Sequence, residues 1–342
     1  MSALGQRESA KQRAVLKGAA DMIEVAGLAK RFGEVQAVAG VDFDVRKGDL
    51  FGLLGPNGAG KTTTINMLTG LARADSGSIR IAGVDCTVNP KAAQHLIGVV
   101  PDESNLYPEL TGFQNLCFCA ALYGMRKAER EARALELLDT FALADAAARK
   151  FAGYSRGMKR KLTIAAAIIH RPQVLFLDEP TTGIDVAGAR QIRQMVADLH
   201  RAGTTVLLTT HYIEEAERLC DRIAFIVAGR IIRIDTVANL IQPVKEKHVM
   251  LLSVSNLTAD VHERLILAFP QADFGPVSGG QVRIESSEPI RVGPLVRFLE
   301  DSGAEVAEAR KVQPSLEEVF VRVTGLEAAA MKREKEKAGA GL

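Results

Sequence analysis

A glycine-rich segment that ends in lysine and threonine carries the strongest chemical signal in the sequence. Residues 55–62 fit the pattern G-x-x-x-x-G-K-[ST] in full, between a predicted strand over 49–54 and a predicted helix over about 61–71. Such glycines let successive backbone N–H groups point into one concavity, and the following helix presents its positive end to the same anion. Lys61 could add a charge for the β- and γ-phosphates of a nucleotide, and the Thr62 hydroxyl could ligate Mg²⁺. The segment therefore predicts a phosphate-binding loop, and a glycine-rich turn that binds nothing is the alternative.

Two carboxylates follow a second predicted strand, the apolar run over 174–177. Ligands of open parallel sheets bind at the carboxyl edge, which is where Asp178 and Glu179 are expected. Asp178 could hold Mg²⁺ directly or through water, and Glu179 could polarise an attacking water as a general base. A strand that happens to end in an acidic turn is the alternative interpretation.

Two further signals are weaker, and only the first is expected at the same edge. His211 closes a strand-like run over 205–209, where it could contact a γ-phosphate or steer a water, or be a purely structural histidine. Ser155 and Gly157 precede a helix-like stretch over 160–169. They suggest an anion site at a helix start or, alternatively, a plain N-cap.

Composition excludes several classes of protein. The 342 residues allow about two domains, and 47% hydrophobic with 25% charged residues is typical of a globular chain. The net charge of +2 gives no electrostatic argument for nucleic-acid binding. No apolar run approaches the ~18 residues of a membrane span, and the basic N-terminus has no apolar core of a secretory signal. Four cysteines are too few for a disulfide scaffold, and a metal site at Cys117 and Cys119 is the lesser alternative to buried thiols.

The chain is expected to divide near Pro243. Residues 1–20 are interpreted as a flexible basic tail, and the strands and helices that alternate after them predict an α/β domain with a parallel sheet. Residues 245–325 predict a small α+β domain, closed by a short helix with Ser315 as N-cap and Glu318 as its capping-box partner. Its predicted elements are a strand over 249–254, a helix over 259–268, strands over 281–286 and 305–312, and a helix over 290–302 between them. Residues 326–342 are interpreted as a charged tail.

The order of five motifs resembles the nucleotide-binding subunits of ABC transporters over about residues 21–240. The motifs are GPNGAGKTT, YSRGMK, LFLDEP, TTGID and TTH, and the YSRGMK serine lies 23 residues before Asp178. That spacing separates this family from other P-loop proteins. The resemblance implies a P-loop NTPase of the ABC type over 21–244, with an inserted helical subdomain at about 103–160. It also implies ATP and Mg²⁺ as cofactors and ATP hydrolysis as the activity.

Individual roles follow from the resemblance position by position. Glu179 and His211 match the catalytic positions, and Thr62, Asp178 and Asp102 match the metal positions. Ser155 and Gly157 match the signature that closes over ATP on the other subunit of a dimer, and Asp185 matches a loop that communicates across it. Phe32 matches the aromatic residue that stacks on adenine, with a core role as the alternative. The matching phosphate-loop residues are Gly55, Pro56, Asn57, Gly58, Ala59, Gly60, Lys61, Thr62 and Thr63.

Two positions depart from the family pattern. Asp102 stands where the family usually has glutamine; its carboxylate could still ligate Mg²⁺, with a different reach and charge, and Glu103 is a lesser substitute. Arg156 replaces a signature glycine. It could lie near a γ-phosphate or face the solvent.

The resemblance implies an ATPase subunit that forms a homodimer and drives a separate integral-membrane permease from the cytoplasmic face of the plasma membrane. The family docks its permease on the helical region, here residues 110–150, and no nucleic acid is expected. The Ser-Arg-Gly-Met form and residues 314–320 resemble the branch that exports drugs, antibiotics, polysaccharides or sodium. The alternative is a soluble ABC ATPase that acts on ribosomes or DNA. The single P-loop, and the 92 residues without sustained heptads between Gly60 and Gly153, favour transport. A permease-free regulator that uses the C-terminal domain as a sensor is a third hypothesis.

Overall fold

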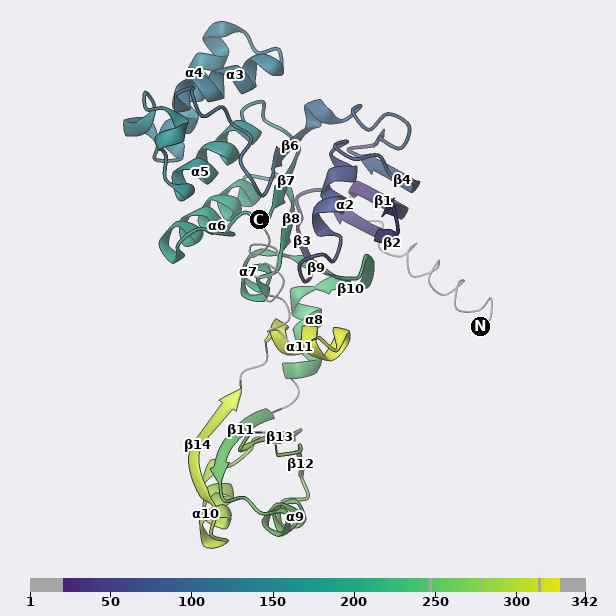
Figure 1. Cartoon of the computed structure of the whole chain (residues 1–342), viewed down its shortest axis with the longest axis vertical. Coiled ribbons are helices and arrows are strands. Elements are labelled where there is room, and N and C mark those ends of the chain that lie inside the picture. Colours follow the sequence, from purple (N-terminus) through teal and green to yellow (C-terminus); the bar gives the residue numbers. More distant parts are fainter. Residues whose placement is uncertain (1–20, 246–247, 278, 313–314, 327–342) are drawn as a thin grey trace. The chain divides into compact units, whose positions relative to one another are not determined.

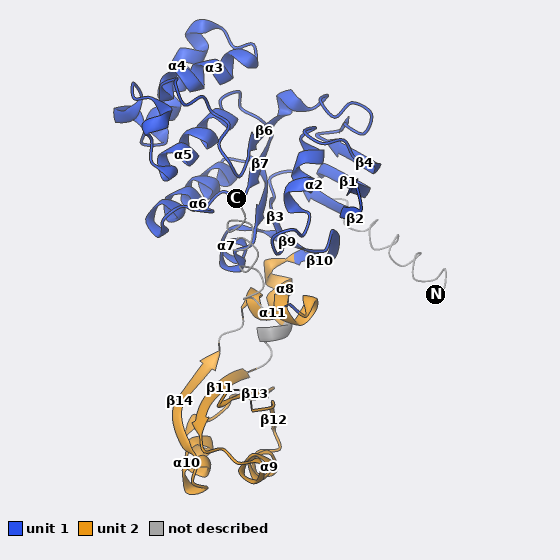
Figure 2. Cartoon of the chain, viewed as in Figure 1, with its two compact units in different colours: residues 1–235, 326–342 blue, residues 236–325 orange. Residues whose placement is uncertain are grey.

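The computed structural model describes residues 21–245, 248–277, 279–312 and 315–326. The chain forms two compact units, residues 1–235 together with 326–342, and residues 236–325 (Figure 2). The tails predicted over 1–20 and 326–342 lie outside the described residues, except for position 326.

A twisted antiparallel sheet begins the first unit. It has the order β2-β1-β4-β5 and consists of β1 (Asp21–Phe32), β2 (Val35–Arg46), β4 (Ser76–Ile81) and β5 (Val84–Asp85). Alternate apolar side chains of these strands are buried, as expected for a sheet with one face against the core. This sheet shares its core with the second sheet of the unit.

The second sheet is largely parallel and carries the residues of chemical interest. Its order is β10-β9-β3-β8-β7-β6, and every residue of β3, β7 and β8 is buried. Such nearly continuous apolar runs are typical of strands that are covered on both faces. The strands are β3 (Leu50–Leu54), β6 (Ile97–Val100), β7 (Val174–Asp178), β8 (Thr205–Thr210), β9 (Arg222–Val227) and β10 (Arg230–Thr236).

Helices cover both faces of this sheet. Helix α2 and the antiparallel sheet lie on one side, and α5 and α6 lie on the other (Figure 1). The predicted helix over 61–71 ends earlier, at Leu68, and Gly70 follows with a φ of 76°. The helices are α2 (Lys61–Leu68), α5 (Arg156–Ala167), α6 (Val186–Arg201) and α7 (Ile213–Leu219).

A helical segment is inserted in the chain between β6 and β7, which are neighbours in the sheet. It contains α3 (Gly112–Leu122) and α4 (Lys127–Thr140), with short 3-10 turns η2 (Ala144–Ala146) and η3 (Phe151–Gly153) before α5. A capping box starts α3, because Thr111 accepts from the Gln114 amide while the Gln114 side chain accepts from the Thr111 amide. A further 3-10 turn, η1 (Gln94–Leu96), precedes β6.

The second unit has a β-α-β-β-α-β core with the antiparallel order β12-β13-β11-β14, which is the ferredoxin-like arrangement. Its predicted strands and helices are present. Sequence analysis missed β12, which has only three residues, and α8, which packs against α11 and places the start of the unit at Thr236 instead of 245. The elements are α8 (Val237–Lys245), β11 (His248–Ser255), α9 (Ala259–Ala268), β12 (Ala272–Phe274), β13 (Gln281–Ser286), α10 (Val292–Asp301), β14 (Glu305–Val312) and α11 (Leu316–Thr324).

Within the described ranges, no helix combines the length and the apolar character that crossing a membrane requires. All four cysteines are free thiols, and the described residues contain no group of three or more His, Cys, Asp or Glu that could hold a metal ion.

Candidate active site

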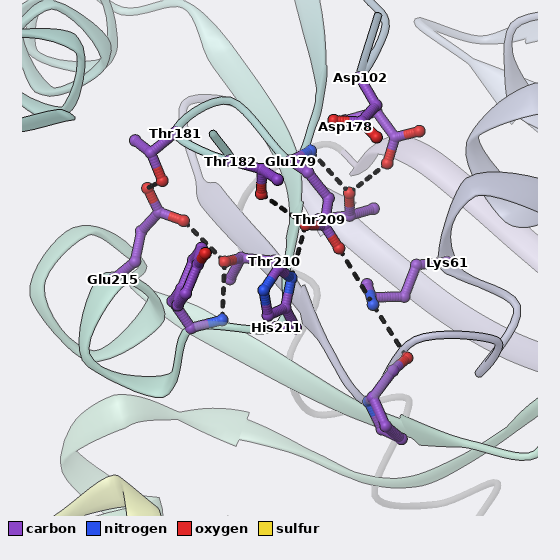
Figure 3. Close-up of polar contacts among 12 residues, drawn as sticks. Lys61, Asp102, Asp178, Glu179, Thr181, Thr182, Thr209, Thr210, His211 and Glu215 are labelled. Atoms are coloured by element: carbon purple, nitrogen blue, oxygen red, sulfur yellow. Dashed lines mark hydrogen bonds and ion pairs between the residues drawn. The ribbon is translucent and has the colours of Figure 1, made fainter. Parts of the chain in front are cut away.

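The carboxyl ends of four neighbouring strands bring the predicted site residues together (Figure 3). The glycine-rich loop follows β3, Asp102 comes two residues after β6, Asp178 ends β7, and His211 follows β8. Lys61, Thr62, Asp102 and Glu179 line a single cleft of about 510 Å³. The parallel register of the strands thus turns motifs that are far apart in sequence into one site.

The glycine-rich loop requires glycine at two positions for steric reasons. Gly60 has a φ of 100°, and a Cβ there would lie 2.4 Å from the carbonyl oxygen of Ala37. A Cβ on Gly55 would lie 2.1 Å from the carbonyl oxygen of Ile226. Because Gly60 is also the N-cap of α2 and has no side chain, the first amides of that helix are left for an anion.

Lys61 is buried and its ammonium lies within the loop. Its Nζ donates to the carbonyl oxygens of Gly55, at 2.8 Å, and Pro56, at 3.0 Å. The same Nζ lies 3.3 Å from Oε1 of Glu179. The loop is therefore closed around its own lysine, which is paired with the carboxylate that follows β7.

Glu179 is the most heavily contacted carboxylate of the site. Its Oε2 accepts from Thr182 Oγ1 at 2.7 Å and lies 2.5 Å from Nδ1 of His211. Burial opposes its charge, but the contact with His211 and the charge of Lys61 together lower the pKa of Glu179 to about 2. Its φ of 47° is costly for a side-chain-bearing residue, and such conformations concentrate at functional sites.

Asp178 and Thr62 form an oxygen pair suited to a hard cation. Asp178 is buried, and its Oδ1 accepts from Thr209 Oγ1 at 2.5 Å. Burial raises the pKa of Asp178, while hydrogen bonds from Thr209 and Thr62 lower it in part. A carboxylate that is desolvated in this way gains from a cation, and hydroxyl and carboxylate oxygens are ligands that Mg²⁺ accepts. The residues present therefore fit Mg²⁺.

Asp102 is held in place by an arginine that sequence analysis did not single out. Arg160, on α5, donates from Nη1 to the carbonyl oxygen of Pro101 and from Nη2 to that of Asp102, both at 2.5 Å. Its Nη2 also lies 3.9 Å from Oδ1 of Asp102. No local pattern could reveal this contact, because it joins positions 58 residues apart.

Five predicted residues lie outside the cluster around Glu179. Ser155 and Asp185 are exposed N-caps, which accept from the amides of Met158 at 3.3 Å and Gly188 at 2.9 Å. Gly157 follows in the first turn of α5. Arg156 is exposed, with Nη1 3.4 Å from the carbonyl oxygen of Gly183. Phe32 is 53% exposed, which rules out the core role, and the Lys30 ammonium lies 5.3 Å from its ring centroid.

A second cleft, of about 540 Å³, lies beside the first. Asp102 lines both clefts, and Arg156, Lys159 and Arg160 bring positive charge to the second. Gly183 and Ile184, from the segment before Asp185, complete its lining on one side. Of the predicted signature segment, Arg156 lines this second cleft, and Lys61 lines only the first.

Known proteins identify the fold and its chemistry. A family model described as ABC transporter matches residues 38–182. The chain is 36% identical over 307 residues to the linearmycin resistance ATP-binding protein of Bacillus subtilis, a match that covers 89% of this chain and 98% of that protein. The chain belongs to the ABC transporter family. Its first unit is an ABC-type ATPase domain, and its activity is ATP hydrolysis.

Other relatives extend the similarity over both units. The daunorubicin/doxorubicin resistance ATP-binding protein of Streptomyces peucetius is 39% identical, with 89% of this chain and 92% of that protein covered. The Nod factor export ATP-binding protein I of Rhizobium etli is 37% identical, with 89% and 94% covered.

Solved structures match the ATPase domain. An ATP-binding subunit of an ABC transporter is 31% identical with a TM-score of 0.59, covering 65% of this chain and 93% of that one. A dimeric ATP-binding cassette in a post-hydrolysis state, bound to ADP and phosphate, is 26% identical with a TM-score of 0.59, covering 63% and 99%.

Proposed function

We propose that this ABC ATPase is the energy-supplying subunit of an exporter, in which ATP hydrolysis drives a separate membrane permease. The single observation that carries the ATPase part is that Lys61 and Glu179 line one cleft and lie 3.3 Å apart, with His211 in contact with Glu179. The export part is supported by relatives named for drug resistance and Nod factor export, which match 89% of this chain.

Nucleotide binding replaces internal contacts of the loop with contacts to phosphate. Backbone amides of the phosphate loop and of the first turn of α2 bind the β- and γ-phosphates, and the Lys61 ammonium leaves Glu179 to bind phosphate oxygens. The exposed ring of Phe32 stacks on adenine. Thr62, Asp178 and Asp102 would hold Mg²⁺, which supplies positive charge to the phosphates when bound.

Hydrolysis then uses the carboxylate that nucleotide binding has released. A carboxylate with a pKa of about 2 is a weak base, and its pKa rises when Lys61 and His211 turn toward phosphate. Glu179 takes a proton from the water as the water oxygen attacks the γ-phosphorus, and the bond between that phosphorus and ADP breaks. His211 holds the γ-phosphoryl oxygens, and the products are ADP and phosphate.

A homodimer explains why the signature residues lie apart from the cluster around Glu179. Ser155, Gly157 and Asp185 lie at exposed helix starts, where they are available to nucleotide on a second subunit. Two chains packed head to tail would place each Ser155 over the partner's phosphate loop. The dimeric cassette bound to ADP and phosphate supports this arrangement, because its fold matches the ATPase domain.

The permease is proposed to dock on the helical segment, which exposes several large apolar side chains. Phe118 and Tyr123 are 39% and 43% exposed on and next to α3, and Leu122 is 72% exposed. Apolar surface of this kind is typical of protein interfaces. The chain would then be held at the cytoplasmic face of the plasma membrane by its permease.

Affinity purification from gently solubilised membranes tests the export proposal. The full chain should co-purify with a polytopic membrane protein in stoichiometric amount. A Phe118→Arg, Leu122→Arg double variant should lose that partner and keep its ATP hydrolysis. The matched control is Val88→Arg, since Val88 is 92% exposed and lies outside the helical segment. Recovery only with ribosomal or DNA-binding proteins would contradict the proposal and favour the soluble alternative.

A further inference from the structure

A buried glutamate outside the recognised motifs joins two of the segments that build the site. Glu215, on α7, is 3% exposed, and neither the P-loop nor the residues around Glu179 include it. Its Oε1 accepts from Thr181 Oγ1 at 2.8 Å, and its Oε2 accepts from Thr210 Oγ1 at 2.7 Å (Figure 3). One carboxylate oxygen thus contacts the segment that follows β7, and the other contacts the end of β8.

The two segments that Glu215 contacts both lead to Glu179 Oε2. Thr181 lies between Glu179 and Thr182, whose hydroxyl donates to Glu179. Thr210 immediately precedes His211, whose Nδ1 lies 2.5 Å from the same Glu179 oxygen. Glu215 therefore fixes the spacing between the segment that carries the base and the segment that carries the histidine.

Backbone contacts extend the reach of each threonine. The Thr210 carbonyl accepts from the amide of Gly55, the first residue of the phosphate loop, at 3.3 Å. The Thr181 carbonyl accepts from the amide of Ile184 at 3.3 Å, in the segment that leads to Asp185. These backbone bonds do not involve the threonine hydroxyls, so losing a hydroxyl contact to Glu215 leaves the bond to the phosphate loop in place.

The network needs an acceptor with two free oxygens. Thr210 Oγ1 already accepts from the Tyr212 amide at 3.0 Å, so its own proton must be donated onward. Thr181 donates from the other side. A carboxylate accepts both protons, whereas an amide offers one oxygen and would leave one hydroxyl without an acceptor. Burial raises the pKa of Glu215, because desolvation disfavours its charged form.

We propose that Glu215 is a positioning residue for ATP hydrolysis, which acts by holding Thr181 and Thr210 so that Glu179 and His211 meet the phosphate together. This goes beyond the established activity, and it requires neither a permease nor the exporter assignment. It predicts an effect on the hydrolytic step and not on nucleotide affinity, because Glu215 has no place in the nucleotide cleft.

The test compares substitutions that remove a single acceptor or donor. Glu215→Gln should lower kcat at least tenfold, with the ATP dissociation constant changed less than twofold. Thr181→Val and Thr210→Val remove only the hydroxyls and should lower kcat similarly, whereas Thr181→Ser and Thr210→Ser should retain it. The matched control is Glu214→Gln on the same helix, where the carboxylate is 84% exposed.

Thermal melting and a double variant separate positioning from folding. In a Glu179→Gln background the Glu215→Gln change should cause no further loss of rate, because the step that it serves is already disabled. A kcat within twofold of wild type for Glu215→Gln would overturn the proposal. It would also be overturned if the rate followed only the folded fraction in the melting curves. If Glu215→Gln is too unstable to measure, the kcat values of Thr181→Val and Thr181→Ser are compared instead. A lowered kcat for valine alone supports the proposal, and equal kcat values overturn it.

Discussion

Replacing Glu179 with glutamine removes a carboxylate whose ionised form the nucleotide-free site stabilises. The contact with His211 and the charge of Lys61 lower the pKa of Glu179 to about 2, against an ordinary 4.5, despite its burial. A group whose pKa is lowered on folding adds stability above its unfolded pKa and loses that stability as pH falls toward its folded pKa. The contribution is of the order of 3 kcal/mol at neutral pH.

The pH window follows from the two pKa values. Between pH 5 and pH 3 this contribution declines by about 2 kcal/mol, since the unfolded carboxylate binds its proton first. Glutamine resembles the protonated acid in shape and is uncharged at every pH. The difference in unfolding free energy between wild type and Glu179→Gln should therefore shrink by that amount as the pH is lowered.

Urea denaturation of the nucleotide-free full chain, followed by far-ultraviolet circular dichroism at pH 5, 4 and 3, measures this difference. Other carboxylates titrate in both variants and cancel in the comparison. Glu214→Gln, which removes an exposed carboxylate on α7, should show a difference that does not vary with pH. A constant difference for Glu179→Gln would refute the conclusion that Lys61 and His211 hold its charge.

Four further substitutions test other parts of the site. Gly60→Ala should weaken ATP binding more than tenfold in an equilibrium titration, because its Cβ would meet the Ala37 carbonyl and alanine disfavours the left-handed φ. Arg160→Lys should lower kcat about tenfold in a steady-state ATPase assay, because a lysine ammonium cannot reproduce the paired guanidinium bonds to the two carbonyls that follow β6. Asp102→Asn should raise the Mg²⁺ concentration for half-maximal hydrolysis severalfold, whereas an unchanged Mg²⁺ titration would remove Asp102 from the metal site. Phe32→Ala should raise the ATP dissociation constant about tenfold while Phe32→Tyr leaves it unchanged, since base–aromatic stacking contributes about 1–3 kcal/mol.

The ATPase fold could be anticipated because its signals are local. The phosphate loop and the pair of carboxylates at the end of β7 can each be recognised within a few residues of sequence. The parallel strands then bring them to one edge, as the rule for open α/β sheets requires. In the second unit, two amphipathic helices and three longer strands were predicted within one or two residues, because each has a clear periodicity.

The residues that sequence analysis missed act through long-range contacts. Glu215 accepts hydrogen bonds from the hydroxyls of Thr181 and Thr210, and Thr181 is 34 residues away in the sequence. Arg160 holds Asp102 across 58 residues. A buried glutamate on a short helix and an arginine in a basic stretch look like ordinary surface residues until the chain is folded. The three-residue β12 was missed because so short a run has no period to detect.

Single-turnover ATP hydrolysis by the purified full chain tests the central claim most directly. Wild type and Glu179→Gln are compared with the protein in excess over ATP and above its dissociation constant, at saturating Mg²⁺, and ATP affinity is measured in parallel. If Glu179 is the base, Glu179→Gln should bind ATP as well as wild type and hydrolyse it at least a hundredfold more slowly, trapping an ATP-bound dimer. Hydrolysis at the wild-type rate would contradict the account and would require another group at the carboxyl edge of the sheet to activate the water.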